Sequence, residues 1–258
     1  MTKHILVGLL AIATPAALSA QTIDIAGVTP AMDPSVIAHG ILVSNIPRQA
    51  VEARQRGQAR AQQPSRRSTT GANLAKPRAV AAVPTSYRPA AAISAQVDRQ
   101  LIAQAEKVTP GAGKEMRDLL TSGHVRKQYH NVAATLGLSP SDAADALAFY
   151  VVAQWGVATD YREMITPAQM KGVRSQVRAL YPKIATSLDT DAKRQVFAET
   201  LIARGVVGAG IHEAAVQAGN EARVKELVQM TQPAAREILG TDPARFELTE
   251  KGLVPKGN

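Results

Sequence analysis

The stretch from Ala143 to Ala153 is apolar almost all the way round a helix, and this feature most constrains the fold. Asp145 is its one charged residue, and the Ala, Leu, Phe, Tyr and Val residues around it leave no polar face. Such a helix is unsuited to a surface, because surface helices of globular proteins keep one polar side. We therefore expect a bundle with this helix at its centre and the other helices packed around it.

Two tetrapeptides carry explicit signals for the start of a helix. Residues 139–142, Ser-Pro-Ser-Asp, offer a hydroxyl at the cap, Pro at the first helical position and a carboxylate at the third. Residues 166–169, Thr-Pro-Ala-Gln, repeat this order with an amide at the third position. The two segments predict helix starts at Pro140 and Pro167, and they indicate no chemistry.

Helical periodicity runs from Ser94 to the end of the chain, and no stretch shows the alternation that marks a strand. We predict an all-α fold, a single helical bundle of about seven to nine helices around the central apolar helix. Gly123, Gly137, Gly219 and Gly240 are the expected stops. The expected helices are 95–107, 113–122, 125–136, 140–157, 167–181, 190–204, 206–218, 221–231 and 233–239.

Residues 1–20 predict a cleaved export signal. Lys3 and His4 give a basic start, an apolar run follows from Ile5, and small residues lead to a cleavage position at Ala20. The apolar core is about 14 residues long, shorter than the roughly 20 that cross a bilayer. The sequence has no cysteine, so neither a disulfide nor a lipid anchor is expected. We predict a periplasmic or secreted mature chain without a transmembrane segment.

Three segments are expected in the mature chain. Residues 21–44 form a short apolar segment that docks on the main domain, binds a partner or is a remnant of the export region. Residues 45–93 are rich in Arg, Pro and Ala, and residues 45–92 carry nine Lys and Arg against one Glu, a net charge of +8. This mixture has too little apolar surface to offset the entropy of ordering, so we predict a disordered basic linker. Residues 94–258 hold the helical domain.

Familiar ligand motifs are incomplete in this chain. His124 and His130 stand six residues apart, whereas a helical metal pair needs three or four. Val216 stands four residues after His212, where a helical zinc motif needs its second ligand. The Gly-rich residues 205–210 follow no strand and indicate a helix break or the close approach of another helix. We predict no metal and no cofactor.

Asp160, Glu163 and Glu213 are the candidate catalytic residues. The first two follow the central helix beside Trp155 and Tyr161, where aromatic residues and carboxylates meet. A carboxylate pair with aromatic walls is what a glycan-cleaving site needs, one group as acid and the other as base or stabiliser. Glu213 would suit an acid if burial raised its pKa. The competing interpretation is a polar loop anchored by Trp155, with Glu213 exposed on the surface.

Residues 142–155 and 246–253 together resemble a family of exported proteobacterial proteins known only as a domain of unknown function. The first segment reads Asp-Ala-Ala-Asp-Ala-Leu-Ala-Phe-Tyr-Val-Val-Ala-Gln-Trp and the second Phe-Glu-Leu-Thr-Glu-Lys-Gly-Leu. The resemblance covers residues 95–255, approximately. It implies an export signal, a variable linker and a helical domain, and it supplies no catalytic residues to transfer.

Three functions remain as hypotheses. The first is an exported non-enzymatic domain that binds a protein or another cell-envelope partner. The second is a cell-wall hydrolase or lyase with a carboxylate site, and the third is a binder of anionic surfaces or polymers through the basic linker. Tyr87 is the one aromatic residue of the linker, so a stacking platform for single strands is missing. No specific nucleic acid is therefore predicted as a partner.

Overall fold

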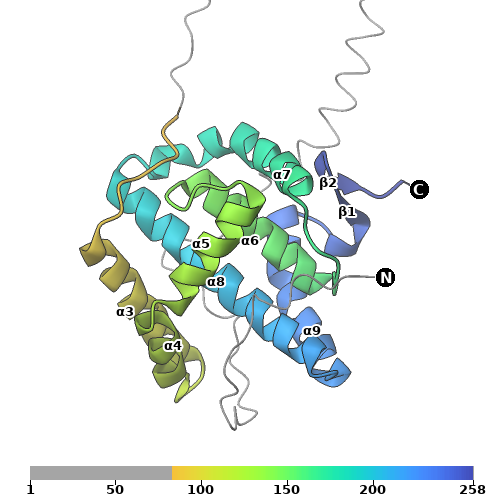
Figure 1. The fold of residues 1–258 in the computed structure, drawn as a ribbon, viewed down its shortest axis with the longest axis horizontal. Coiled ribbons are helices and arrows are strands. Elements are labelled where there is room, and N and C mark those ends of the chain that lie inside the picture. The colour runs from red at the N-terminus through yellow and green to blue at the C-terminus, as the bar shows by residue number, and fades with distance from the viewer. Residues whose placement is uncertain (1–82, 258) are drawn as a thin grey trace, which may run out of the picture.

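Seven α-helices and a C-terminal hairpin make up residues 83–257, the part of the chain that the computed structural model describes (Figure 1). The helices are α3 (Ala91–Val108), α4 (Ala112–Thr121), α5 (His124–Leu136), α6 (Ala143–Ala158), α7 (Pro167–Leu180), α8 (Asp191–Gln217) and α9 (Glu221–Leu239). The 3-10 turns are η1 (Tyr181–Lys183), η2 (Ala185–Ser187) and η3 (Pro243–Arg245), and the hairpin pairs β1 (Phe246–Thr249) with β2 (Gly252–Pro255). The predicted all-α bundle is confirmed. The predicted signal, the apolar segment and most of the basic linker lie outside the described residues.

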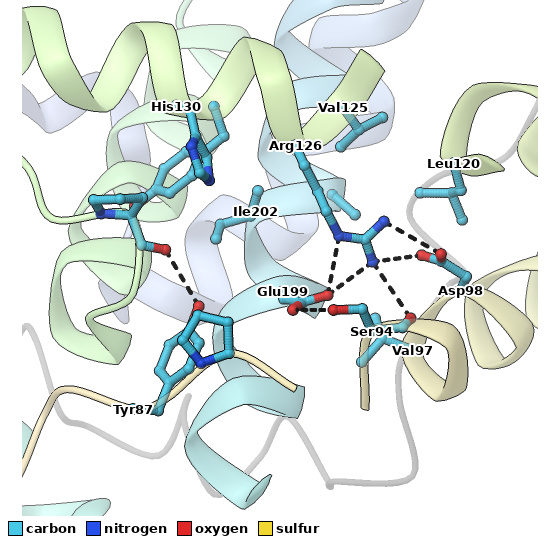
Figure 2. A pocket seen from close by; sticks show the side chains of 14 residues that line it. Tyr87, Ser94, Val97, Asp98, Leu120, Val125, Arg126, His130, Glu199 and Ile202 are labelled. Carbon is cyan, nitrogen blue, oxygen red and sulfur yellow. Dashed lines mark hydrogen bonds and ion pairs between the residues drawn. The ribbon is translucent and has the colours of Figure 1, made fainter. Parts of the chain in front are cut away.

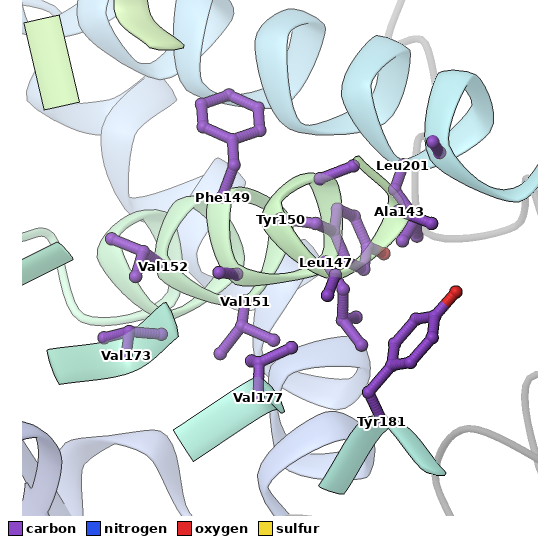
Figure 3. Packing of buried hydrophobic residues seen from close by; sticks show 14 of the residues in the cluster. Ala143, Leu147, Phe149, Tyr150, Val151, Val152, Val173, Val177, Tyr181 and Leu201 are labelled. Atoms are coloured by element: carbon purple, nitrogen blue, oxygen red, sulfur yellow. The ribbon is translucent and has the colours of Figure 1, made fainter. Parts of the chain in front are cut away.

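Helix α6 is the centre of the bundle, as its sequence predicts. Every residue of α6 except Gly156 is buried, and the helix packs along α7, α8 and α9. Figure 3 shows Val151 and Val152 directed toward Val173 and Val177 of α7. Burying a valine side chain stabilises a fold by about 1.5–3 kcal/mol. This apolar contact therefore fixes α6 between its neighbours. None of the helices within residues 83–257 combines the length and the apolarity that a membrane crossing requires.

Helix α8 is continuous, so the predicted break near Gly205 is wrong. The helix runs from Asp191 to Gln217 without interruption. The other expectation for the Gly-rich stretch holds, because the ring of Phe149 on α6 lies directly over Gly205. A Cβ atom placed on Gly205 would stand 2.6 Å from Cε1 of that ring, closer than atoms pack. Glycine at this position allows α6 and α8 to approach closely, although glycine inside a helix is destabilising by about 0.5–1 kcal/mol relative to Ala.

Helix α9 also continues where the sequence predicts two helices. Pro233 lies inside it, although proline removes one backbone N–H and usually breaks a helix. Pro233 is exposed, so water can satisfy the carbonyl that loses its partner. Val224, Leu227 and Ile238 lie on the buried side and pack the helix onto the bundle. Tertiary packing here outweighs the local signal.

The two predicted helix starts have different outcomes. Thr166 caps α7 with a full capping box, in which Gln169 returns the bond to the Thr166 backbone. The start predicted at Pro140 is wrong, since α6 begins at Ala143 and Asp142 is its cap. Asp142 is held in an extended conformation because its backbone forms a bridge with Ser86, and the helix begins only beyond this bridge.

The hairpin of β1 and β2 is the element that sequence analysis misses. Its strands have four residues each, too few for alternation to stand out. The hairpin lies against α7. The side-chain amide of Gln176 bonds the backbone of β2 as a neighbouring strand would, since it accepts from Leu253 N–H at 3.0 Å and donates to Leu253 O at 3.0 Å. A Cβ on Gly172 would lie 2.3 Å from the backbone nitrogen of Gly252. The hairpin therefore depends on a glycine 80 residues earlier.

An extended segment, residues 83–90, leads into α3 and crosses the bundle. Sequence analysis assigns these residues to the linker, yet Tyr87 is buried. Its backbone N–H donates to Ser141 O at 3.0 Å, and Ala143 N–H donates to Thr85 O at 2.8 Å. Gln195 of α8 clamps Ala90 by accepting from its N–H and donating to its carbonyl. The bundle therefore includes this crossing segment.

Candidate functional site

A cavity of about 160 Å³ lies beneath the crossing segment (Figure 2). Helices α3, α4, α5 and α8 contribute its other walls, so the cavity joins parts of the chain that are distant in sequence. Most of its lining is apolar, and Figure 2 shows Leu120, Val125 and Ile202 around it. Apolar walls with a few charged groups are features that this cavity shares with small-molecule sites, although its volume is smaller than theirs.

One side of the cavity carries the Arg126 cluster, which we define as Arg126, Asp98 and Glu199. The guanidinium of Arg126 donates from Nε and Nη2 to Oε2 of Glu199, at 3.2 and 2.8 Å. It also donates from Nη2 and Nη1 to the two oxygens of Asp98, at 2.8 and 3.2 Å. One cation thus faces two carboxylates, and the formal charge of the cluster is −1.

Glu199 is held rigidly within this cluster. Its Oε1 accepts from Ser94 Oγ at 2.7 Å and from Gln195 Nε2 at 2.7 Å, while Oε2 accepts the two bonds from Arg126. Its side chain is 10% exposed, whereas that of Asp98 is 18% exposed. Each oxygen of Asp98 accepts one hydrogen bond. The carboxylate of Asp98 therefore keeps acceptor capacity toward the cavity side of the cluster.

Two tyrosines line the cavity near the charged cluster. Burial raises the pKa of both hydroxyls, and the carboxylate of Glu199 raises the pKa of Tyr87 further. Tyr87 donates to Pro140 O at 3.3 Å, while the buried hydroxyl of Tyr129 has no hydrogen-bond partner among the described residues. Both hydroxyls therefore stay protonated and suit hydrogen bonding rather than service as a base.

Sequence reasoning misses the Arg126 cluster. Its members stand 28 and 73 residues apart, and no motif links them. A weak signal exists in α8, where Gln195 and Glu199 interrupt a helix half that is otherwise rich in buried apolar residues. Polar residues four apart on such a face indicate a buried network, but they do not identify the partner.

Asp160, the first of the candidate carboxylates, lies just after α6 and is paired with Arg162. It binds Arg162 through both oxygens, and its Oδ1 lies 3.0 Å from Nε2 of the buried His212. Arg162 also donates to Glu221 at the start of α9. Arg162 lowers the pKa of Asp160 through its hydrogen bonds, burial opposes this with a smaller effect, and the hydrogen bond with His212 lowers the pKa further. Asp160 is therefore a stable anion, the opposite of what a general acid requires.

Glu163 and Glu213 are both exposed. Glu163 accepts a long bond of 3.4 Å from Tyr161, and Glu213 accepts from Gln217 on its own helix at 2.8 Å. The structure thus joins Asp160 to His212 and Arg162, and it gives no contact between the three candidate carboxylates. The predicted carboxylate site remains a hypothesis.

Trp155, expected beside the candidate carboxylates, faces the interior. It is buried, and its indole N–H donates to Pro243 O at 3.2 Å. Its ring also packs against Tyr161, with centroids 4.9 Å apart. The tryptophan therefore anchors η3 and the loop after α6, which agrees with the interpretation of a loop fixed by Trp155.

The two histidines of α5, His124 and His130, lie in different environments. His124 is near Gln128, with 3.2 Å between their side-chain nitrogens, and the exposed His130 stands at the cavity. Within residues 83–257, no three His, Asp or Glu side chains are grouped in a way that could hold a metal ion. The prediction of no metal and no cofactor stays a prediction for the whole chain.

Comparison with known protein families assigns the chain to one of them. Residues 3–256 match the model described as a family of unknown function, DUF6683. The chain belongs to this family. The match extends well beyond residues 95–255, where the sequence resemblance was seen, and it supports an unknown-function domain. Neither a curated protein nor a solved structure matches the chain.

Proposed function

We propose that this chain is an exported, non-enzymatic helical domain that binds a protein or another cell-envelope partner. Export is supported by the basic start, the short apolar run and the small residues of positions 1–20. Under this proposal the chain works in the periplasm or outside the cell, in a bacterium of the kind the family resemblance implies. The helical domain then supplies the binding surface.

The pairing of Glu199 and Asp160 with arginines of the same domain carries the proposal. Glu199 is paired with Arg126, and Asp160 is paired with Arg162 and bonded to His212. A general acid needs a carboxyl that holds a proton near the working pH, and an ion-paired carboxylate does not. Glu163 and Glu213 are both exposed to solvent. These side chains suit the stability of the fold and the recognition of a ligand.

A substrate screen tests the absence of catalysis. The purified full chain is incubated with peptidoglycan, peptide and ester substrates, and no turnover is expected. Turnover that disappears in Asp160→Asn or Glu213→Gln would overturn the proposal. That result would establish the alternative of a cell-wall hydrolase or lyase with a carboxylate site.

A second arm tests binding directly. The full chain is cross-linked in intact cells, and the cross-linked component is identified, purified and mixed with the full chain in solution. A saturable complex between the two purified components supports the proposal. The proposal is contradicted if neither a cross-linked envelope protein nor a cross-linked cell-wall polymer forms a complex with the full chain in solution.

The charge distribution favours one second candidate, a binder of anionic surfaces. Residues 45–92 hold a net charge of +8 of the chain's total of +9. Each basic residue near an anionic membrane adds about 1 kcal/mol to association, and salt screens this attraction. Binding to anionic vesicles should therefore weaken steeply with salt and vanish when the nine basic residues are replaced by Gln. Binding that ignores salt would reject this candidate.

A further inference from the structure

We propose that the cavity beside the Arg126 cluster binds a small organic cation, an ammonium or guanidinium group on a short aliphatic stem. The inference rests on the proposed binding function and names the chemistry that one of its sites recognises. The evidence is the charge of the cluster, the acceptors left on it, and the size and lining of the cavity.

The charge of the cluster gives the sign of the ligand. Arg126 supplies one positive charge, while Asp98 and Glu199 supply two negative ones at hydrogen-bond distance from it. The excess charge of −1 lies in a partly buried wall, where water screens it less than at the surface. An added cation would complete the balance, and an anion would be repelled.

The cluster leaves one carboxylate free to receive such a cation. Each oxygen of Glu199 already accepts two hydrogen bonds. Each oxygen of Asp98 accepts one, and its side chain is still 18% exposed. A carboxylate oxygen has two acceptor positions, so Asp98 can take N–H donors of an ammonium or guanidinium without losing Arg126.

The other walls suit an aliphatic stem. Val97, Leu120 and Ile202 line the cavity, together with the rings of Tyr87 and Tyr129. Long cationic side chains bury their methylene stems on such surfaces, and aromatic faces attract the charged end. A cavity needs only about 10–15 Å³ of this kind of volume to hold one water. The cavity of about 160 Å³ is therefore large enough for a short stem such as that of butylammonium.

The same cation can come from two sources. One is a free small amine, and the other is a Lys or Arg side chain of a polypeptide, including the basic residues 45–82 of this chain. The experiment uses the full chain and, in parallel, a full-length variant in which the eight Lys and Arg of residues 45–82 are replaced by Gln. Binding of an amine only to the variant would show that the chain's own side chains occupy the cavity.

Calorimetric titration with four probes tests the inference. Butylammonium and butylguanidinium should bind in the millimolar range, about what a ligand of this size reaches. Butanol and butyrate have similar stems, and each should bind about tenfold more weakly or not at all. Equal binding of butanol and butylammonium, preference for butyrate, or binding of neither the small cations nor a peptide with a central Lys to either protein would overturn the inference. A peptide with a central Lys that binds where free amines do not would assign the polypeptide source.

Variants then place the site. Asp98→Asn should lower the affinity for butylammonium about tenfold, while Asp118→Asn, on the exposed side of α4, should leave it unchanged. Circular dichroism confirms that both variants fold, and the probes on the natural chain remain decisive if one does not. Equal affinity in both variants would overturn the assignment to this cavity. If the natural chain binds neither the amines nor the Lys peptide but still binds the cross-linked partner, this inference is rejected and the proposed function stands.

Discussion

Two ionic clusters of this domain differ in charge balance. The Arg126 cluster sets one guanidinium against two carboxylates beside a cavity. The second, the Asp145 cluster, comprises Asp142, Asp145, Arg174 and Arg178 and sets two guanidiniums against two carboxylates. The balanced cluster ties α6 to α7, and the unbalanced one leaves a charge for something else to meet.

The difference shows how buried charge can serve a fold or a ligand. Asp145 is fully buried, and its oxygens accept from Arg174, Arg178 and the Ser139 N–H. Buried ions are tolerated when partners satisfy them, as here. Asp98 is less enclosed and keeps acceptor capacity. The comparison predicts large stability effects at the Asp145 cluster and smaller ones, with ligand effects, at the Arg126 cluster.

Asp145→Asn should have the largest effect. The change leaves Arg178 with Asp142 and leaves Arg174 without a carboxylate partner among the described residues, and it weakens the bond to Ser139. Removing one partner of a buried ion pair costs about 3 kcal/mol, at the low end of the usual range because both arginines reach solvent. Urea unfolding measures this loss, with Asp118→Asn as the exposed control. A loss as small as in the control would contradict the structural role of the cluster.

Glu199→Gln should cost less, about 2 kcal/mol. The amide keeps the shape of the side chain, but it loses the charge and turns one acceptor into a donor toward Ser94 or Arg126. Asp98 still pairs with Arg126, so the guanidinium keeps one carboxylate partner. Urea unfolding beside exposed Glu247→Gln gives the difference. A cost equal to that of Asp145→Asn would erase the contrast between the clusters.

Asp98→Asn should lower stability by about 1 kcal/mol. Arg126 keeps its two bonds to Glu199, and the cluster changes from a charge of −1 to neutral. The same variant should lose most of its affinity for butylammonium. A large loss of stability, measured by urea unfolding, would show that the unbalanced cluster is structural after all.

Asp160→Asn, which removes the ion pair with Arg162, should have the smallest effect on stability. That effect should depend on pH. The folded pKa of Asp160 lies below the ordinary 3.8, mainly because of Arg162. The stabilisation is therefore fully present above pH 3.8 and is lost as the pH falls through the lower folded pKa. Solvent screening limits it to about 0.5 kcal/mol. Unfolding curves at several pH values should show a slightly flatter acid limb in Asp160→Asn, and a steeper limb would contradict the shift.

Local signals predict much of the fold. The capping box at Thr166 forms as its sequence indicates, and Gly137 and Gly240 end α5 and α9 with φ of +70° and +68°, a conformation that glycine adopts readily. The buried position of α6 follows from its lack of a polar face. These features depend on residues within one or two helical turns of each other. A short stretch of sequence is therefore sufficient to predict them.

The cavity and its cluster could not be predicted in this way. Arg126 and Glu199 are 73 residues apart, and each alone resembles an ordinary helical charge. The candidate carboxylates were chosen for their neighbours in sequence, and Asp160 proved to be paired with Arg162 and His212. Pairing of distant side chains depends on how helices cross, which no short segment specifies.

The sequence by itself determined the helical class, the central helix and the start of α7, because periodicity and capping act over three or four residues. Only the tertiary structure decided that α8 passes Gly205 and α9 passes Pro233 unbroken, since contacts with other helices outweigh local breaks. The tertiary structure also decided the position of the C-terminal hairpin against α7 and the pairing of one arginine with two carboxylates beside the cavity. Those features arise where distant segments meet, and there packing and charge pairing set the free energy.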